Sequence, residues 1–302
     1  GFRLIILLAL PVIAFQGSDA HENTLYEISA EYNPQNKELS CREKIHYVNR
    51  TELRQNTIFM RFYRESRYEN QESSDSTAET NVNKTDKIII RRSAYNKKAA
   101  EIIPVLDGTI GMIIPDEGLP PGDSLIVEIG YIFDVPYLND HIGCFSGGAL
   151  FTQWYPQLCP IINGEWLIRP YIEFADYLNN FADYKVQVNI PSLYKIAASG
   201  TLDNKSESDT TNIYNFVAQN AAQFAWAVGD YKIKQINHGG IDINYFYLES
   251  EDNIEGISEI TISAVDYLKD NIGDFPFPEL NIVHVPRKGV ELSYPMFIAQ
   301  DV

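Results

Sequence analysis

The sequence predicts a mainly β protein that ends in a short mixed α/β region. Two observations carry this prediction: apolar and polar residues alternate in short runs over most of the chain, and one amphipathic helical pattern occurs near residue 260. Alternation with period two is typical of half-buried strands, whereas a helix requires a period of 3.6. The chain has 302 residues, 45% of them hydrophobic, which suffices for one large or two medium domains.

The first and larger region, residues 22–235, is predicted to be a sandwich-like β domain. Turn residues such as Gly, Pro, Asn and Ser separate its alternating runs. Almost no apolar side chain occurs at 65–87, which predicts a solvated loop. The expected strands cover 26–30, 44–48, 87–90, 110–114, 124–133, 183–189, 194–198 and 214–217.

The second region, residues 236–302, is predicted to mix strands with a helix. A strand at 241–248 precedes an amphipathic helix at 253–271, which ends near Gly273. A rigid Phe-Pro-Phe-Pro turn at 275–278 leads to strands at 280–285 and 294–299. A helix inserted between strands marks the start of a second domain. The expected apolar face of the helix comprises Ile254, Ile257, Ile260, Val265 and Leu268.

The first twenty residues have the pattern of a secretory signal peptide. Arg3 precedes a twelve-residue apolar run, and small residues follow at Ser18 and Ala20. At 1.5 Å per residue the run covers about 18 Å, short of the roughly 30 Å hydrocarbon core. The alternative is the end of a longer transmembrane anchor, which would associate the protein with a membrane. Both interpretations predict an extracytoplasmic protein, in which Cys144 and Cys159 either pair or remain reduced and buried.

Composition excludes several functional classes. The chain carries 24 Lys and Arg against 41 Asp and Glu, a formal net charge of −17, which argues against a nucleic-acid-binding surface. None of the five histidines lies within four residues of another, so no H-E-x-x-H zinc helix is present. No G-x-S-x-G elbow and no Gly-rich phosphate loop occurs either. By motif alone, the chain contains neither catalytic residues nor metal ligands.

A series of aromatic and polar motifs nevertheless follows a characteristic order. The motifs are Phe151-Thr-Gln153-Trp-Tyr-Pro, Gly164-Glu-Trp166, Ala182-Asp-Tyr184-Lys-Val-Gln-Val188, Ala225-Trp226-Ala-Val-Gly229 and Phe275-Pro-Phe-Pro-Glu-Leu-Asn-Ile-Val-His-Val-Pro286. Over about residues 25–302, this series resembles the N-terminal half of zinc aminopeptidases related to aminopeptidase N and leukotriene A hydrolase, the gluzincin metallopeptidases. The resemblance implies a saddle-like or sandwich β domain over 22–235, followed by the truncated start of a thermolysin-like α/β catalytic domain over 236–302.

The resemblance also implies substrate-binding residues. Gln153 matches a family glutamine that contacts the substrate's amino terminus; its alternative role is to satisfy backbone groups at a strand end. The segment from Gly289 to Ser293 matches the family's G-x-M-E-N or G-x-M-E-Y-P motif, whose glutamate binds the free α-amino group. Alignment on Tyr294 and Pro295 places Ser293 at the glutamate position. Glu291 lies two residues earlier, about 6.6 Å along the same strand face, where its alternative role is that of a solvent-facing residue.

In the family, the zinc ligands and the general base come from an H-E-x-x-H helix and a downstream glutamate, beyond the motif at residues 289–293. The sequence ends before such a segment. The expectation is therefore zinc in the full-length protein, no zinc bound by the residues present, and no hydrolysis by this chain alone. The expected partners are the N-termini of peptide substrates. Ser293 in place of glutamate favours an alternative, a non-catalytic aminopeptidase-like binding or scaffold module, either alone or joined to membrane helices.

Overall fold

The computed structural model describes residues 24–62, 92–95, 98–99, 101–106, 109–138, 141–170, 178–248 and 254–301. The predicted signal peptide or anchor, the predicted loop at 65–87 and the predicted strand at 87–90 lie outside these ranges. Within them, no helix combines the length and the apolar character needed to span a membrane.

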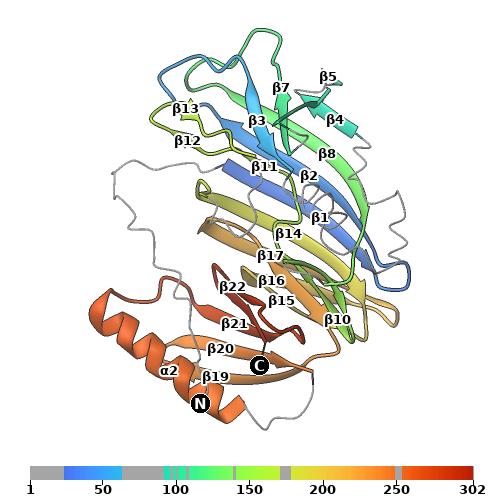
Figure 1. Cartoon of the computed structure of the whole chain (residues 1–302), viewed down its shortest axis with the longest axis vertical. Coiled ribbons are helices and arrows are strands. Elements are labelled where there is room, and N and C mark those ends of the chain that lie inside the picture. Colours follow the sequence, from blue (N-terminus) through green and yellow to red (C-terminus); the bar gives the residue numbers. More distant parts are fainter. Residues whose placement is uncertain are drawn as a thin grey trace, which may run out of the picture.

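An eight-stranded sheet runs through the upper and middle parts of the molecule as drawn in Figure 1. Its strand order is β16-β17-β14-β1-β2-β8-β4-β5. The first strand of the chain lies near the middle of this sheet, parallel to β14 and antiparallel to β2. The strands are β1 (Thr24–Asn33), β2 (Glu38–Val48), β4 (Arg92–Tyr95), β5 (Lys98–Ala99), β8 (Ser124–Asp134), β14 (Ala182–Pro191), β16 (Thr201–Glu207) and β17 (Thr211–Ala221).

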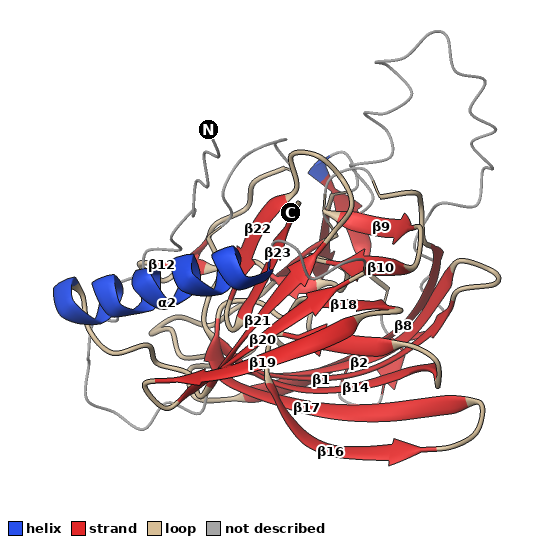
Figure 2. Cartoon of the chain, turned by 90° about the horizontal axis from the view of Figure 1, so that it is seen from below, coloured by secondary structure: helices blue, strands red, loops and turns tan. Residues whose placement is uncertain are grey.

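Two four-stranded sheets and a short hairpin cover the buried face of the large sheet (Figure 2). The first sheet has the order β15-β18-β10-β9 and the second β11-β3-β7-β6. Their strands are β15 (Lys195–Ala198), β18 (Trp226–Gly229), β10 (Gly148–Phe151), β9 (Ile142–Phe145), β11 (Gln157–Leu158), β3 (Ile58–Arg61), β7 (Ile110–Ile113) and β6 (Ile103–Val105), and the hairpin joins β12 (Ile161–Ile162) to β13 (Glu165–Trp166).

Side-chain alternation explains this layered β arrangement. Along β8 every second residue is buried, as period-two patterning requires. The buried side chains of the large sheet meet those of the two smaller sheets in one core. At its centre the rings of Phe151 and Trp226 stack with centroids 4.0 Å apart, and Trp154 is fully buried beside them. The prediction of a mainly β fold is confirmed.

A five-stranded sheet with the order β19-β20-β21-β23-β22 follows. One face packs against the sheet that contains β10 and β15, and the other is covered by α2 (Figure 2). A hydrogen bond reinforces the first contact, because Asn281 Nδ2 donates to the backbone oxygen of Ala198 at 3.0 Å. The elements are β19 (Lys232–His238), β20 (Ile241–Tyr247), α2 (Ile254–Asn271), β21 (Glu279–His284), β22 (Glu291–Tyr294) and β23 (Phe297–Gln300).

Two details of this region differ from the sequence-based expectation. The predicted strand at 294–299 is interrupted, because Pro295 has no N–H to donate and Met296 adopts a left-handed φ of 59°, so the chain turns between β22 and β23. Ile260 is 42% exposed and does not belong to the buried face of α2. At 100° per residue it lies about 120° around the helix from Ile254, whereas Ile262 packs against the sheet instead.

The end of α2 follows the expected pattern. Gly273 has a φ of 147°, and its N–H donates to the oxygen of Leu268 at 3.0 Å. A glycine accepts this backbone conformation without strain, so it ends the helix where the sequence predicts.

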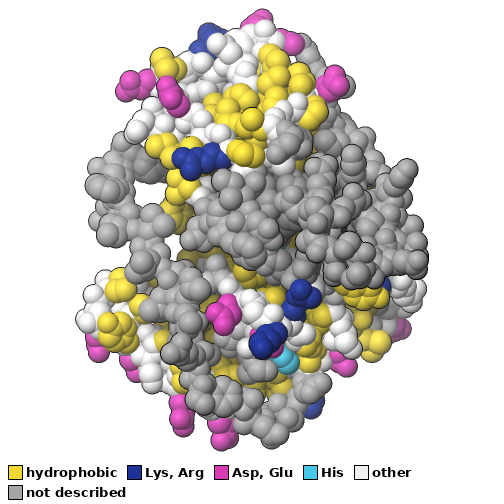
Figure 3. All heavy atoms as spheres, in the orientation of Figure 1, with side chains coloured by type: hydrophobic (Ala, Val, Ile, Leu, Met, Phe, Trp, Pro, Cys, Tyr) yellow, Lys and Arg dark blue, Asp and Glu magenta, His cyan; other side chains and the backbone are white. Residues whose placement is uncertain are grey.

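The surface shown in Figure 3 is uneven in character. Hydrophobic side chains gather on its upper part, where Figure 1 places β3, β7, β12 and β13. Exposed apolar residues of these elements and their turns include Leu53, Ile114 and Ile162. Acidic side chains lie mainly around the rim of the same view.

Candidate functional site

The candidate substrate-binding strand, β22, forms one edge of the five-stranded sheet. Within the described residues it pairs with β23 alone, through Glu291 opposite Gln300 and Ser293 opposite Ile298. Its second edge therefore presents backbone donors and acceptors to which an extended peptide can add. Gly289, just before the strand, has a φ of 88° and open space around its Cβ position, so it provides a turn there.

The two faces of β22 have different surroundings. Leu292 and Tyr294 pack in the apolar cluster between the five-stranded sheet and the β domain. Because side chains alternate along a strand, Glu291 and Ser293 point to the other face, on the side of α2. Glu291 is exposed and Ser293 half-buried. The side chain of Glu291 makes no hydrogen bond or ion pair within the described part of the chain.

Gln153 lies in the β domain, two residues after the end of β10. Its neighbours are both fully buried: Thr152 Oγ1 donates to the oxygen of His141 at 2.5 Å, and Trp154 Nε1 donates to the oxygen of Phe224 at 3.0 Å. Gln153 itself is half-buried and has a left-handed φ of 50°, which is uncommon for a non-glycine residue. The two anchored neighbours thus hold Gln153 in a defined position at the surface of the core.

The predicted site residues come from two different parts of the fold. Gln153 belongs to the β domain, whereas Glu291, Ser293 and Gly289 belong to the last hairpin of the five-stranded sheet. Their roles in substrate binding stay predictions. The described residues contain no group of three or more His, Cys, Asp or Glu side chains that could hold a metal ion. No ligand set for zinc is thus available within them.

The three cysteines are buried and form no disulfide. Cys41 lies in β2, Cys144 in β9 and Cys159 directly after β11. Burial raises the pKa of the Cys159 thiol to about 12. At neutral pH this thiol is therefore protonated and a poor nucleophile.

A second feature, which the sequence-based reasoning missed, is a small polar cavity between the large sheet and β3. Its volume is about 20 Å³, and Arg61, Gln157, Tyr26 and Tyr47 line it together with Trp166. Arg61 donates to the oxygen of Leu178 at 3.0 Å, to Gln157 Oε1 at 3.0 Å and to Asn179 Oδ1. The sequence signal for this site is slight: Arg61 is a charged residue between the apolar residues Met60 and Phe62.

The cavity residues are almost completely buried. Arg61, Gln157 and Tyr47 expose 5%, 8% and 6% of their surface, respectively. Burial raises the pKa of Tyr47 to about 12, and burial is also the main cause of the raised pKa of Tyr26. Both hydroxyls are therefore protonated at neutral pH and available as hydrogen-bond donors.

Comparison with solved structures identifies proteins that share the fold of this chain. A mutant of the M1 zinc metallopeptidase from Deinococcus radiodurans, bound to a Tyr-Ser-Ala substrate, matches with a TM-score of 0.63 at 13% identity. This match covers 92% of the present chain and 59% of the other. The chain has the fold of the N-terminal part of an M1 zinc metallopeptidase. No family model and no curated protein matches the sequence.

Two further M1 structures agree with this assignment of the fold. The M1 zinc metallopeptidase from Deinococcus radiodurans itself has a TM-score of 0.60 at 13% identity, with 93% of this chain and 60% of the other covered. A mutant two-domain M1 enzyme bound to L-arginine gives a TM-score of 0.62 at the same identity and the same coverage. The chain thus spans about 60% of the length of the M1 structures that it matches.

Proposed function

We propose that this chain is the N-terminal portion of a longer zinc-dependent aminopeptidase. In this proposal it supplies the β domain and the first sheet and helix of the catalytic domain, and zinc is bound by a segment beyond the residues present. The observation that carries the proposal is that the match to an M1 structure covers 92% of the chain, which is more than residues 22–235 alone account for. The match is therefore not limited to a β-sandwich of general type.

The peptide-binding part of the proposal rests on β22. A peptide added to the open edge of β22 gains main-chain hydrogen bonds, and a carboxylate nearby pairs with its N-terminal ammonium. The carboxylate of Glu291 is exposed and makes no hydrogen bond or ion pair within the described residues, so it is available for this role. Gly289 precedes the same strand and Ser293 lies within it, and Gln153 would bind from the β domain. Two M1 structures that match the fold are bound to a tripeptide and to an amino acid, which supports a peptide substrate.

The sequence that follows residue 302 in the gene provides the first test. The proposal expects an H-E-x-x-H motif within about a hundred codons and a further glutamate downstream, since three protein ligands bind a catalytic zinc. The longer protein should then contain one zinc per chain by elemental analysis and release amino acids from aminoacyl chromogenic substrates. The 302-residue chain should do neither.

A degenerate motif in the longer protein would contradict the proposal and favour the non-catalytic binding module, for which Ser293 is the supporting observation. The anchoring role of Glu291 has its own test in the active longer protein. Glu291→Gln should raise KM for substrates with a free amino terminus, and the same substitution at the exposed Glu255 of α2 should leave KM unchanged. Equal KM values for Glu291→Gln and the unmodified protein would remove Glu291 from the site. Extracytoplasmic localisation also stays a proposal, since residues 1–20 carry it.

A further inference from the structure

The exposed surface of α2 has two sides that differ in charge. At 100° per residue, all charged residues of the helix lie between about 60° and 160° around it from Ile254, which marks the buried face. They are Glu255, Glu259, Asp266, Lys269 and Asp270. The remaining exposed residues lie at about 180–260° and form the uncharged side of α2, which comprises Gly256, Ile260, Ser263, Tyr267 and Asn271.

The uncharged side presents apolar surface and room for a close contact. Ile260 and Tyr267, which lie seven residues apart on this side, are 42% and 61% exposed. Gly256 lies one turn before Ile260, and a Cβ atom there would have no other atom within 4 Å. Since glycine has no side chain, the backbone of another element can approach α2 closely at this point.

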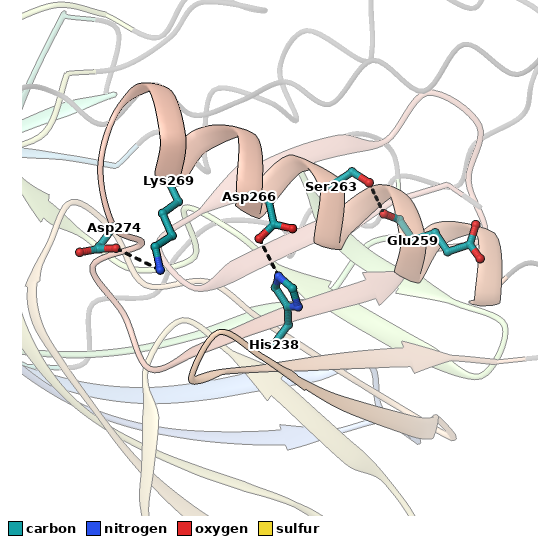
Figure 4. A network of polar contacts seen from close by, with 6 residues as sticks. All are labelled: His238, Glu259, Ser263, Asp266, Lys269 and Asp274. Atoms are coloured by element: carbon teal, nitrogen blue, oxygen red, sulfur yellow. Dashed lines mark hydrogen bonds and ion pairs between the residues drawn. The ribbon is translucent and has the colours of Figure 1, made fainter.

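The polar residues of the uncharged side have hydrogen-bond partners within the helix. Ser263 Oγ donates to the backbone oxygen of Glu259 at 2.8 Å, as Figure 4 shows. Asn271 Nδ2 donates to the backbone oxygen of Tyr267 at 2.7 Å. Burial beneath another element therefore costs less than it does for donors that are left unpaired.

The two sides of α2 face opposite edges of the five-stranded sheet. On the charged side, Asp266 Oδ1 lies 2.7 Å from His238 Nε2, so this side faces β19 (Figure 4). The uncharged side lies at a similar angle from the buried face in the other direction, towards β23 and β22. There, Ile298 and Gln300 are only half-buried on the face towards α2, whereas Phe297 on the other face is fully buried. The described residues thus cover this face of β23 only in part.

The sheet topology directs the chain that follows β23 to the same place. The strands β20, β21 and β23 run parallel, so their carboxyl ends lie at one end of the sheet. The helix α2 begins after β20 and returns over one face, whereas the other face packs against the sheet that contains β10 and β15. A segment that follows β23 and returns in the same manner lies beside the uncharged side of α2.

We propose that the uncharged side of α2 and the adjoining face of β23 bind an amphipathic helix of the chain that follows residue 302. This inference rests on the proposed function, which requires a longer protein, and the matched M1 structure extends well beyond the 59% of its length that is covered here. Ile260, Tyr267 and Ile298 contact the apolar face of that helix. Glu291 and Ser293 share the face of Ile298, so the helix forms a wall beside the candidate substrate-binding strand β22.

The reactivity of cysteines introduced at two adjacent positions tests the proposal. Ile260→Cys lies on the uncharged side and Glu259→Cys on the charged side; both positions are exposed, and the native cysteines are buried. A maleimide should label both variants at similar rates in the 302-residue chain. In the longer protein, Ile260→Cys should react at least about tenfold more slowly, because its thiol is reached only when the helix detaches. Glu259→Cys is the matched control and should react at an unchanged rate.

Equal labelling rates of Ile260→Cys in the two proteins would overturn the proposal. Slow labelling of Ile260→Cys in the 302-residue chain would also overturn it, because another part of this chain or a second copy would then cover α2. Dilution distinguishes these two cases, since it restores the rate only for a second copy.

Zinc content and aminopeptidase activity of the longer protein test the proposed function separately. An active longer protein in which Ile260→Cys reacts rapidly would refute the helix interface alone. Protection of Ile260→Cys in a longer protein without zinc would refute the proposed function and leave the interface in place.

A charge introduced at the same position tests the interface through stability. Ile260→Lys should change the Tm of the 302-residue chain little, because the position is exposed there. It should lower the Tm of the longer protein by several degrees, since an ammonium group is then buried in an apolar contact. Leu193→Lys is the control: Leu193 is 84% exposed in the β domain, and its replacement should change neither Tm. Equal shifts for both substitutions in the longer protein would contradict the proposal.

Discussion

His238 Nε2 lies 2.7 Å from Asp266 Oδ1, so the last residue of β19 is joined to the middle of α2 (Figure 4). The two side chains are 30% and 56% exposed. Figure 4 also shows a second pair, between Lys269 and Asp274 at the end of the helix. The first pair links two elements that are separated in the sequence, whereas the second links the helix only to the residues that follow it.

This difference leads to a prediction about the attachment of α2. Asp266→Asn should lower the free energy of unfolding by about 0.5–1 kcal/mol, the size typical of a partly exposed pair. Chemical denaturation of Asp266→Asn, His238→Gln and the double variant measures the coupling. Lys269→Gln is the control and should cause no measurable change, because its partners are 3.7 Å apart and 59% and 87% exposed. Additive effects of Asp266→Asn and His238→Gln would contradict the prediction.

Glu43 in β2 predicts an unusual dependence of stability on pH. Its carboxyl group is 2% exposed, has no hydrogen-bond partner within the described residues, and has a pKa well above its usual range because of burial. In the folded state the group therefore stays protonated to a higher pH than in the unfolded state. The contribution of Glu43 to the free energy of unfolding is fully present below the unfolded pKa of about 4.5. It is lost as the pH rises towards the folded pKa.

Glu43→Gln tests this contribution, because an amide has nearly the same shape and does not ionise. The variant should be about 1–3 kcal/mol more stable than the unmodified chain at about pH 8, and about equally stable near pH 4.5. Urea denaturation over this pH range measures both values. A difference that does not depend on pH would show that Glu43 does not titrate as described.

Glu27 should make the stability of the folded chain depend on pH in the opposite direction. Its Oε2 atom lies 2.6 Å from His46 Nε2, and this hydrogen bond is the main cause of a lowered pKa of the Glu27 carboxyl. A lowered pKa gives stability that is present above the unfolded pKa and lost as the pH falls through the folded pKa. Glu27→Gln should therefore destabilise the chain at about pH 7 and have little effect at about pH 2 to 3.

The matched control for Glu27 is Glu31 on the same strand, which is exposed and makes no ion pair within the described residues. Thermal unfolding of Glu27→Gln and Glu31→Gln at several pH values compares the two. Equal pH profiles for both variants would mean that His46 does not influence the titration of Glu27.

Replacement of glycine by alanine should have opposite effects on the free energy of unfolding at two positions. A Cβ atom on Gly148 in β10 would lie 2.4 Å from the backbone oxygen of Val228, a contact that forces the paired strands apart. Gly148→Ala should therefore cost several kcal/mol, about 2–4, as overpacking in a core does. A Cβ atom on Gly256 in α2 would have no other atom within 4 Å, so Gly256→Ala should stabilise the chain by up to about 1 kcal/mol. The free energies of unfolding of both variants measure this contrast.

The sequence predicted the long strands well because period-two alternation is visible over ten or eleven residues, as in β8. Elements of two residues, such as β5 and β11, are too short to show any period. The pairing of β1 with β14 was also beyond reach, since neither strand contains local information about a partner 158 residues away. The prediction that Ile260 lies on the buried face of α2 was wrong. Apolar residues occupy more of the helix surface than the part that packs against the sheet.

The candidate site also combines residues that sequence motifs predict with features that only the folded structure shows. Gln153, Gly289, Glu291 and Ser293 came from motif order, which places residues along the chain but does not show which strand face they occupy. That Glu291 points away from the face packed on the β domain became visible only with the burial of Leu292. Gln157 and Arg61 are 96 residues apart, so only the folded structure brings them to one cavity.

The central position of β1 in the large sheet determines when this sheet can form during synthesis. When the ribosome has finished β1, the second edge of this strand has no partner until β14 arrives 158 residues later. At 5–20 residues per second, this interval lasts roughly 8–30 s. During that time the unpaired backbone groups of this strand edge are open to other chains, which makes the nascent protein prone to aggregation. The large sheet is therefore completed late in synthesis, and assistance by a chaperone would act in this interval.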